Sequence, residues 1–343
     1  MNHLKGKRIL VTGACGTVGA ELTRMLLEEP EFEVAEVLGL DNNETELFFI
    51  DQRFLADDRA SFTLGDIRDK EKLRSLMAGI DVVFHTAALK HVIISERAPF
   101  DAVQTNILGV QNIIEAAQSN QVEKVIFTSS DKAVNPTNVM GTSKLMGERL
   151  ITAANNQRNC STIFASTRFG NVIGSRGSVF SIFKQQIQKG GPLTITDPEM
   201  TRFIMTIEEA VRLVLDSANV AQGGEVLVTK MPVIRIMDLA EVMIELLAPE
   251  FGHDPASIEI VTVGSKPGEK LYEELMSDEE TRRAQELTRY FCITPAFQST
   301  HRTINYSYPD LVTTHVDNPY NSSNEASISK DELKAFLRNG GLI

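Results

Sequence analysis

The stretch KRILVTGACGTVG, residues 7–19, decides the fold of this chain. Its first six residues predict a short buried strand, and a helical pattern follows directly after the last glycine. Glycines spaced as Gly-x-x-Gly-x-x-Gly allow a tight turn and bring helix N–H groups close to a pyrophosphate. The stretch therefore predicts a dinucleotide-binding strand, turn and helix. The residues that we expect to contact the dinucleotide are Gly13, Gly16, Thr17, Val18 and Gly19.

The next apolar run supports this prediction, which the glycine spacing alone would leave weak. Residues 35–40 form a strand-like run that ends in Asp41, at an offset of about 20 residues, where a carboxylate can accept hydrogen bonds from the adenosine ribose. Asp41 would repel a 2′-phosphate, so the sequence favours NAD over NADP as the cofactor. The alternative for Asp41 is an acid that caps a helix or a turn.

Two further strand-like runs complete the expected cofactor site. The third run ends at Asp66 and Ile67, beside the expected position of the adenine. The fourth ends at Ala87 and Ala88, whose small side chains let a cofactor lie against the backbone.

Strand-like and helix-like segments alternate through about residue 170, which predicts an α/β fold with a Rossmann-type, doubly wound parallel sheet. Glycine-rich loops and shorter elements follow. We expect a dinucleotide-binding domain of residues 1–170, to which residues 204–230 return. A smaller C-terminal substrate-binding lobe would be built from the discontinuous segments 171–203 and 231–343, the second of which includes the tail of the chain. A serine followed by acids before residues 333–337 predicts a capped last helix.

The composition of the 343 residues excludes several classes of protein. A net charge of −12 argues against a general affinity for nucleic acid or for an anionic membrane. The three cysteines lie far apart, so neither a disulfide framework nor a zinc site is indicated, and no residues have metal-ligand spacing. The sequence has no apolar run near 18 residues and no signal core. We therefore expect a cytoplasmic protein that does not insert into a membrane.

Acid–base chemistry is indicated where the strand-like run 125–128 ends. Ser130, Asp131 and Lys132 deliver a hydroxyl, a carboxylate and an amine to one point, and Lys144 follows on the next helix. A dinucleotide-binding fold normally pairs such a lysine with a tyrosine four residues earlier, whereas this chain has Met140 there. A thioether has no proton to exchange, so either the chain is not a catalyst or its acid–base chemistry lies on the residues from 130 to 132.

In these features the chain resembles the extended short-chain dehydrogenase/reductase superfamily, and within it the nucleotide-sugar 4,6-dehydratases that act on UDP-N-acetylglucosamine, as a variant with Met in place of Tyr. The similarity covers nearly the whole length. The matching segments are residues 87–92 (AALKHV), 105–109 (TNILG), 130–138 (SDKAVNPTN), 168–172 (RFGNV), 175–179 (SRGSV), 194–203 (TITDPEMTRF) and 267–271 (PGEKL).

The resemblance implies a mechanism with internally recycled NAD. Hydride leaves sugar carbon 4, water is eliminated across carbons 5 and 6, and the hydride returns to carbon 6. It assigns Asp131 as the acid for the 6-hydroxyl, Lys132 as the base at carbon 5 and Ser130 as the hydrogen-bonding partner of the 4-oxygen. The pKa of Lys132 would have to fall, through burial or positive neighbours such as Lys144 and Lys90, for it to act near pH 7. Met140 would be a spacer.

Binding residues follow from the same resemblance. For the cofactor it adds Asn106 and Lys144. Arg202 and Asn171 should hold the substrate diphosphate, while Glu269 should accept from the uridine ribose. The remaining residues expected at the UDP-N-acetylglucosamine site are Lys90, Ser178, Val179 and Lys266.

Two other functions stay open at this stage. A UDP-sugar 4-epimerase would return the hydride to carbon 4, but epimerases rely on the tyrosine that Met140 replaces. A catalytically silent NAD-binding sensor could lose the tyrosine, although it would have no need to keep the residues from 130 to 132. The glycine-rich turn and residues 40–44 look closer to the dehydratases that retain the configuration of carbon 5 than to those that invert it. We also expect a homo-oligomer.

Overall fold

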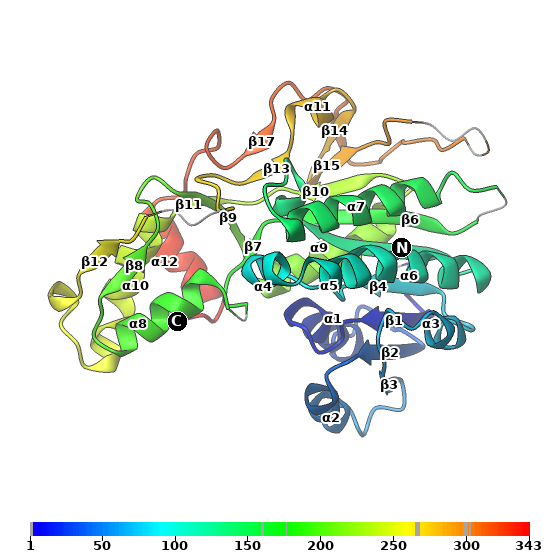
Figure 1. Cartoon of the computed structure of the whole chain (residues 1–343), viewed down its shortest axis with the longest axis horizontal. Helices are drawn as coiled ribbons and strands as arrows, with labels where there is room; N and C mark the ends of the chain where they lie inside the picture. The colour runs from blue at the N-terminus through cyan, green and yellow to red at the C-terminus, as the bar shows by residue number, and fades with distance from the viewer. Residues whose placement is uncertain (1–2, 159–160, 176, 265–267, 298–300, 302) are drawn as a thin grey trace.

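The computed structural model describes residues 3–158, 161–175, 177–264, 268–297, 301 and 303–343. Within these residues, ten strands form one sheet in the order β16-β14-β15-β10-β6-β5-β4-β1-β2-β3 (Figure 1). The strands from β3 to β10 are parallel to one another. Beyond β10, each of the strands β15, β14 and β16 pairs antiparallel with the strand before it in the sheet. Its strands are β1 (Arg8–Thr12), β2 (Glu36–Asp41), β3 (Ala60–Leu64), β4 (Val82–His85), β5 (Lys124–Ser130), β6 (Ile163–Phe169), β10 (Val226–Thr229), β14 (Ala284–Leu287), β15 (Tyr290–Ile293) and β16 (Leu311–Thr313).

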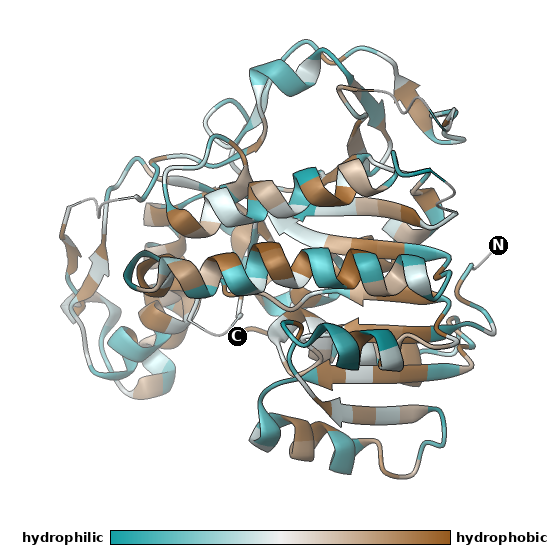
Figure 2. Cartoon of the chain, turned by 45° about the vertical axis from the view of Figure 1, so that its right-hand side comes forward, coloured by the Kyte–Doolittle hydropathy of each residue, from teal (hydrophilic) through white to brown (hydrophobic). Residues whose placement is uncertain are grey.

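Alternate residues of the parallel strands pack against helices on opposite faces of the sheet. Ile9 and Val11 of β1 join the apolar cluster of α1 and α9, whereas Leu10 joins the cluster of α3, α6 and α7. Figure 2 shows hydrophobic residues concentrated along these strands. The helices are α1 (Thr17–Glu28), α2 (Glu44–Arg53), α3 (Lys70–Leu76), α4 (Val92–Arg97), α5 (Pro99–Val103), the π-helical turn η1 (Gln104–Leu108), α6 (Gly109–Ser119), the 3₁₀ turn η2 (Asp131–Ala133), α7 (Val139–Ala154) and α9 (Ile207–Val220).

A third apolar cluster lies beside the sheet, where α8, α10 and α12 pack together (Figure 1). The last helix begins with the expected capping box, in which Ser329 and Glu332 exchange side-chain to backbone hydrogen bonds. The remaining elements of the chain are β7 (Asn171–Val172), α8 (Val179–Gln188), β8 (Leu193–Ile195), β9 (Thr201–Met205), β11 (Val233–Arg235), α10 (Ile236–Leu247), η3 (Pro249–Phe251), η4 (Pro255–Ser257), β12 (Ile260–Thr262), β13 (Glu274–Met276), α11 (Asp278–Thr281), β17 (Tyr320–Asn321) and α12 (Lys330–Asn339).

The doubly wound parallel sheet expected from the sequence is confirmed, with two differences in detail. Strands β14, β15 and β16 extend the central sheet, although the sequence places their residues with the second lobe. These strands have only three or four residues each, and β14 and β16 carry mixed polar and apolar residues, so only β15 has an apolar run, and that run is too short to place it in the central sheet. The third strand also ends earlier than expected, so Asp66 lies two residues beyond β3. The division into two lobes stays a prediction.

No helix in the described part of the chain is long and apolar enough to cross a membrane. Among the same residues, no group of three or more His, Cys, Asp or Glu side chains could hold a metal ion.

Candidate active site

Close backbone contacts shape the glycine-rich turn after β1. Gly13 has φ 72°, and a Cβ built there would lie 2.7 Å from the backbone N of Ala87. A Cβ at Gly19 would lie 2.1 Å from the carbonyl O of Gly13, so both positions require glycine. The exposed Gly16 precedes α1 with no side-chain cap, and the first turn of α1 contains no acid. Its N–H groups therefore suit an anion such as a pyrophosphate.

Asp41 is tied to this turn. Its Oδ2 accepts a hydrogen bond of 2.9 Å from the N–H of Cys15, and its Oδ1 accepts one of 2.9 Å from the N–H of Asn43. Each oxygen keeps a further lone pair, so a ribose hydroxyl could still donate to Asp41. Asp66 is held by Arg68, whose guanidinium donates to both carboxylate oxygens and lowers the pKa of Asp66 to about 2.

Asn106 forms hydrogen bonds with the backbone of the loop that follows β4. Its Oδ1 accepts from the N–H of Leu89, and its Nδ2 donates to the O of Leu89 and to the hydroxyl of Ser143, each at 2.9 Å. The buried amide thus ties the loop after β4 to α7. In this arrangement Asn106 positions backbone next to the expected cofactor site. We call this region, from the glycine-rich turn to the loop after β4, the coenzyme half.

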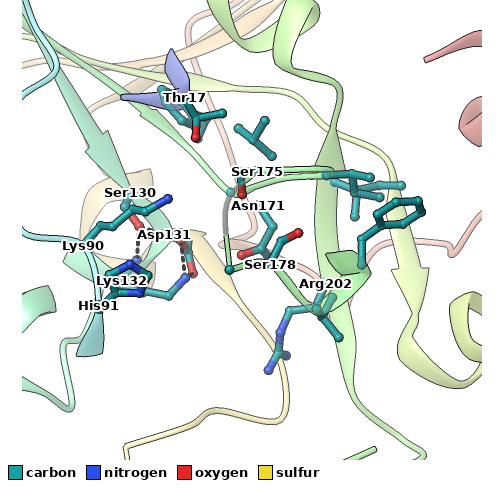
Figure 3. Close-up of a pocket in the computed structure, with 18 of the residues that line it drawn as sticks. Thr17, Lys90, His91, Ser130, Asp131, Lys132, Asn171, Ser175, Ser178 and Arg202 are labelled. Carbon is teal, nitrogen blue, oxygen red and sulfur yellow. Dashed lines mark hydrogen bonds and ion pairs between the residues drawn. The ribbon is translucent and has the colours of Figure 1, made fainter. Parts of the chain in front are cut away.

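Ser130, Asp131 and Lys132 converge where β5 ends and η2 begins (Figure 3). The hydroxyl of Ser130 donates to Oδ1 of Asp131 at 2.7 Å, and the ammonium group of Lys132 donates to both oxygens of Asp131 at 3.1 and 3.0 Å. Asp131 is buried, whereas the Lys132 side chain retains 35% of its exposure, facing the cavities described below. The three side chains form one connected hydrogen-bonded group.

Lys132 and Lys144 have opposite pKa shifts. Burial alone would lower the pKa of Lys132, but the carboxylates of Asp131 and Glu273 outweigh it and leave that pKa above its usual value. The fall in pKa that a base near pH 7 would need is therefore not present in the resting site. Burial lowers the pKa of Lys144 to about 8, against a smaller opposite effect of Glu148. Its Nζ donates to the O of Thr128 at 2.9 Å.

Met140 lies buried in the first turn of α7 and lines the cavity. Its thioether offers no proton to a substrate. His85 is fully buried below the site and bonds the hydroxyl of Thr12 at 2.7 Å. Burial, with a smaller effect of Lys144, lowers the pKa of His85 to about 3, so this imidazole is neutral. Met140 is therefore packed as a spacer would be, and His85 makes a structural hydrogen bond.

We call β7, β9, the start of α8 and residues 268–274 the substrate half. Charged side chains with little exposure connect these segments. Nε of Arg202 lies 3.3 Å from Oε1 of Glu273, and Nδ2 of Asn171 donates to the same oxygen at 2.6 Å. Arg202 also donates to the carbonyl groups of Lys270 and Leu271. The residue that joins Arg202 to Asn171 is thus Glu273, a buried carboxylate.

A second cluster of buried ion pairs connects the elements that carry the site. The guanidinium of Arg168 pairs with Glu148 at 2.6 Å and with Glu280 at 3.0 Å, and it donates to the O of Leu275. All three charged side chains are nearly inaccessible to solvent. The cluster ties α7, which carries Lys144, to the end of β6 and to the chain after β13.

A cavity of about 710 Å³ joins the two halves. It is lined by all five residues that the sequence singles out for catalysis and by Gly16, Thr17, Val18, Gly19, Ala88, Lys90, Asn171, Ser178, Val179, Arg202 and Glu269. The expected site residues that do not line it are Gly13, Asp41, Asp66, Ile67, Ala87 and Asn106. Lys266 lies outside the described residues. Figure 3 shows Arg202, Asn171 and Ser178 facing the Ser130–Lys132 group across this cavity.

Sequence reasoning missed Glu273. The residue stands two positions after the segment 267–271, on which the resemblance rests. Its contact with Asn171 spans 102 residues of sequence, so no local spacing pattern could reveal it. The only available signal was the acidic pair Glu273-Glu274, which follows the motif.

Residues 9–295 match the model of the polysaccharide biosynthesis protein family. A UDP-N-acetylglucosamine 4,6-dehydratase (inverting) of Campylobacter jejuni is 39% identical over 303 residues, 88% of this chain and 86% of that one. A UDP-glucose 4-epimerase of Rickettsia felis is 36% identical over 97% of this chain and 96% of that one. An uncharacterized membrane protein of Methanocaldococcus jannaschii is 46% identical over 98% of this chain and 97% of that one.

The chain is also similar to solved structures. The X-ray structure of Pen from Bacillus thuringiensis superposes with a TM-score of 0.90 at 39% identity and covers 99% of both chains. A UDP-glucuronic acid 4-epimerase of Bacillus cereus, solved in complex with UDP-4-deoxy-4-fluoro-glucuronic acid and NAD, superposes with a TM-score of 0.65 at 25% identity, covering 77% of this chain and 88% of that one.

Proposed function

The chain belongs to the polysaccharide biosynthesis protein family, within the extended short-chain dehydrogenase/reductase nucleotide-sugar dehydratases, and we propose that it dehydrates UDP-N-acetylglucosamine to a UDP-4-keto-6-deoxy sugar. The observation that carries this proposal is the hydrogen-bonded group of Ser130, Asp131 and Lys132 beside Met140. An elimination requires one acid and one base close together, and this group supplies both.

The resting group differs from the reactive one by the position of a single proton. Lys132 is protonated and Asp131 ionised in the resting ion pair. Transfer of one proton from Nζ to Oδ2 across 3.0 Å leaves a neutral amine to remove the hydrogen of carbon 5 and a carboxylic acid to protonate the 6-hydroxyl. Elimination then restores the ion pair, so the two groups need no proton from solvent. Ser130 would hold the 4-oxygen.

The coenzyme half fits a dinucleotide because its glycine turn has no room for a side chain and its helix N-terminus is open. We propose NAD as the bound cofactor, with Asp41 on the adenosine ribose and the first turn of α1 on the pyrophosphate. When bound, NAD would take hydride from carbon 4 and return it to carbon 6. Lys144 would lie next to the nicotinamide ribose and, with a pKa near 8, could exchange a proton there.

A UDP-sugar 4-epimerase is the second candidate, since epimerases match the chain over nearly their whole length. Met140 weighs against it because an epimerase needs a proton-exchanging group beside carbon 4 and has no use for the Asp131–Lys132 pair. A silent NAD-binding sensor would have no use for that pair either.

Incubation of the protein with UDP-N-acetylglucosamine, followed by mass spectrometry of the nucleotide sugar, separates the three functions. A dehydratase gives a product lighter by one water. An epimerase gives a product of unchanged mass with a different retention time, and a sensor gives no product. Either of the last two results would contradict the proposal.

A further inference from the structure

Glu273 is more deeply buried than its charge would suggest. It retains 5% of its exposure, and its carboxylate accepts from the N–H of Phe203 at 3.0 Å and from Asn171 at 2.6 Å. Its one cationic contact within 4 Å, among the described residues, is Nε of Arg202 at 3.3 Å. A buried carboxylate stays ionised only while such partners compensate for the water that it has lost.

The charges around Glu273 come from three elements. Asp131 and Lys132 lie on η2, Arg202 lies on β9, and Glu269, Lys270 and Glu274 belong to its own segment. Burial, followed by the charge of Asp131, raises the pKa of Glu273 to about 7, while Arg202 and Lys132 oppose the rise. The ionisation of Glu273 therefore depends on how fully Arg202 remains its partner.

Protein groups already use most of the donors of Arg202. Its Nη1 donates to the carbonyl groups of Thr201 and Leu271, and its Nη2 donates to that of Lys270. A diphosphate that engages Arg202 must share this guanidinium with Glu273 or draw it away. In both cases negative charge comes closer to Glu273, which raises the pKa of its carboxyl group further.

Glu273 also has a route for a proton. A second cavity of about 310 Å³ is lined by the buried Glu273 and Asp131, by Lys132, and by the exposed residues Ile93 and Thr137. Solvent can thus exchange a proton with Glu273 without passing through the cofactor site.

We propose that Glu273 is a positioning residue that becomes more fully protonated, with the proton drawn from solvent, when a nucleoside diphosphate binds Arg202. In its charged form Glu273 helps keep Lys132 protonated, and it holds Arg202 and Asn171 in place. In its neutral form one of the two carboxylate charges that stabilise the ammonium group of Lys132 is gone, so substrate binding prepares Lys132 to give up its proton. This proposal rests on the proposed function, because it takes Arg202 as the diphosphate site.

The test is calorimetry of UDP binding to the NAD-loaded protein near pH 7.5, in two buffers that differ in heat of ionisation. A rise of about one unit in the pKa of Glu273 corresponds to about half a proton taken up per UDP. The terminal phosphate of UDP can only lose protons on meeting a guanidinium, so uptake must come from the protein. We expect uptake by the wild type and by Glu225→Gln, and none by Glu273→Gln.

Glu225 is a matched control because it too is a buried carboxyl group whose pKa burial raises, yet it contacts residues 222 and 223, far from the cavity. UDP binding without uptake, or with equal uptake by Glu273→Gln, overturns the role of Glu273 and leaves the proposed function standing. No UDP binding by the wild type overturns both.

If Glu273→Gln fails to fold, the pH dependence of uptake by the wild type decides. Uptake should be largest between about pH 7 and 8 and fall away below about pH 6, where Glu273 already carries its proton. Uptake that does not vary with pH overturns the proposal.

Discussion

The coenzyme half and the substrate half hold their residues by different means. In the coenzyme half, backbone contacts decide the geometry: Gly19 packs on Gly13, and Asp41 accepts from two N–H groups of neighbouring turns. In the substrate half, buried charges join segments distant in sequence, as Glu273 does for Arg202 and Asn171. The first half therefore depends on shape, and the second on charge compensation. The Ser130–Lys132 group lines the cavity between them.

Removing either member of the catalytic pair should have the largest effect. Asp131→Asn and Lys132→Met each delete one proton-transfer group, so turnover of UDP-N-acetylglucosamine should fall by about 10²–10⁴. Binding of NAD and UDP, measured by calorimetry, should persist because neither half loses its own contacts. Lys230→Met, which removes a lysine paired with Glu286 outside the cavity, is the control. A variant that keeps more than half of wild-type turnover removes that residue from the mechanism.

Breaking the Arg168 cluster should cause the largest loss of stability. Arg168→Met leaves Glu148 and Glu280 buried without their partner, which costs about 3–5 kcal/mol in the free energy of unfolding. The control is Arg212→Met, which removes more exposed ion pairs worth about 1 kcal/mol or less. Urea unfolding measures both. Equal effects of the two variants would show that buried charge does not hold this region together.

The same cluster should be sensitive to acid. Burial would raise the pKa of Glu280, but Arg168 outweighs it and lowers that pKa to about 2. The folded pKa lies below the usual value near 4.5, so the stabilisation is complete above about pH 4.5 and disappears as the pH falls through about 2. We expect this part of the acid destabilisation to be absent from Glu280→Gln in acid unfolding curves.

A change at Asp41 should weaken the coenzyme half by a smaller amount. Asp41→Asn leaves one backbone N–H facing an amide donor, which should cost about 1–3 kcal/mol in the stability of the turn, and NAD should bind more weakly because the turn is less well held. The exposed Asp58→Asn is the control. The nucleotide released by heat from the wild type should be NAD by mass. Predominant NADP would overturn the role of Asp41. A 2′-phosphate would need a basic partner, and the basic residue nearest to Asp41 in the sequence, Arg53, already pairs with Glu28 at 2.8 Å.

The smallest effect is expected at Met140. Met140→Leu nearly conserves volume, so the free energy of unfolding should fall by less than about 1.5 kcal/mol and most of the activity should remain. Ser130→Ala, by contrast, removes the hydroxyl expected at the 4-oxygen and should slow the appearance of NADH absorbance in a single turnover. The account of how the site works without a tyrosine fails if Met140→Leu abolishes activity in a folded protein while Ser130→Ala leaves NADH formation unchanged.

The difference between the halves also explains what the sequence could predict. The glycine turn, the strand before it and the Ser130–Lys132 group are local in sequence, and each appears in the structure where it was expected. The direction of the pKa shift of Lys132 could not be predicted, because it depends on Glu273, which folding brings in from a distant segment. Strands β14 to β16 were missed because they are only three or four residues long and join the sheet through long-range pairing at the edge that β10 offers.

Several earlier expectations remain predictions, among them the homo-oligomer and the direct contacts of Asp66, Ile67 and Asn106 with a cofactor. In the structure Asp66 is engaged by Arg68, and Asn106 by Leu89 and Ser143. These contacts give both residues a positioning role that does not need the cofactor. A solved complex with NAD would show whether either also touches it.

The most direct test of the central claim is turnover of UDP-N-acetylglucosamine in deuterated water, followed by proton NMR of the product. If Lys132 removes the hydrogen of carbon 5 and the hydride from carbon 4 returns to carbon 6, the product carries deuterium at carbon 5 and none in its new methyl group. The same spectrum reports whether carbon 5 is retained, as the sequence suggests, or inverted. A product with hydrogen at carbon 5, deuterium in the methyl group, or an intact 6-hydroxyl would contradict the 4,6-dehydration that we propose for the Asp131–Lys132 pair.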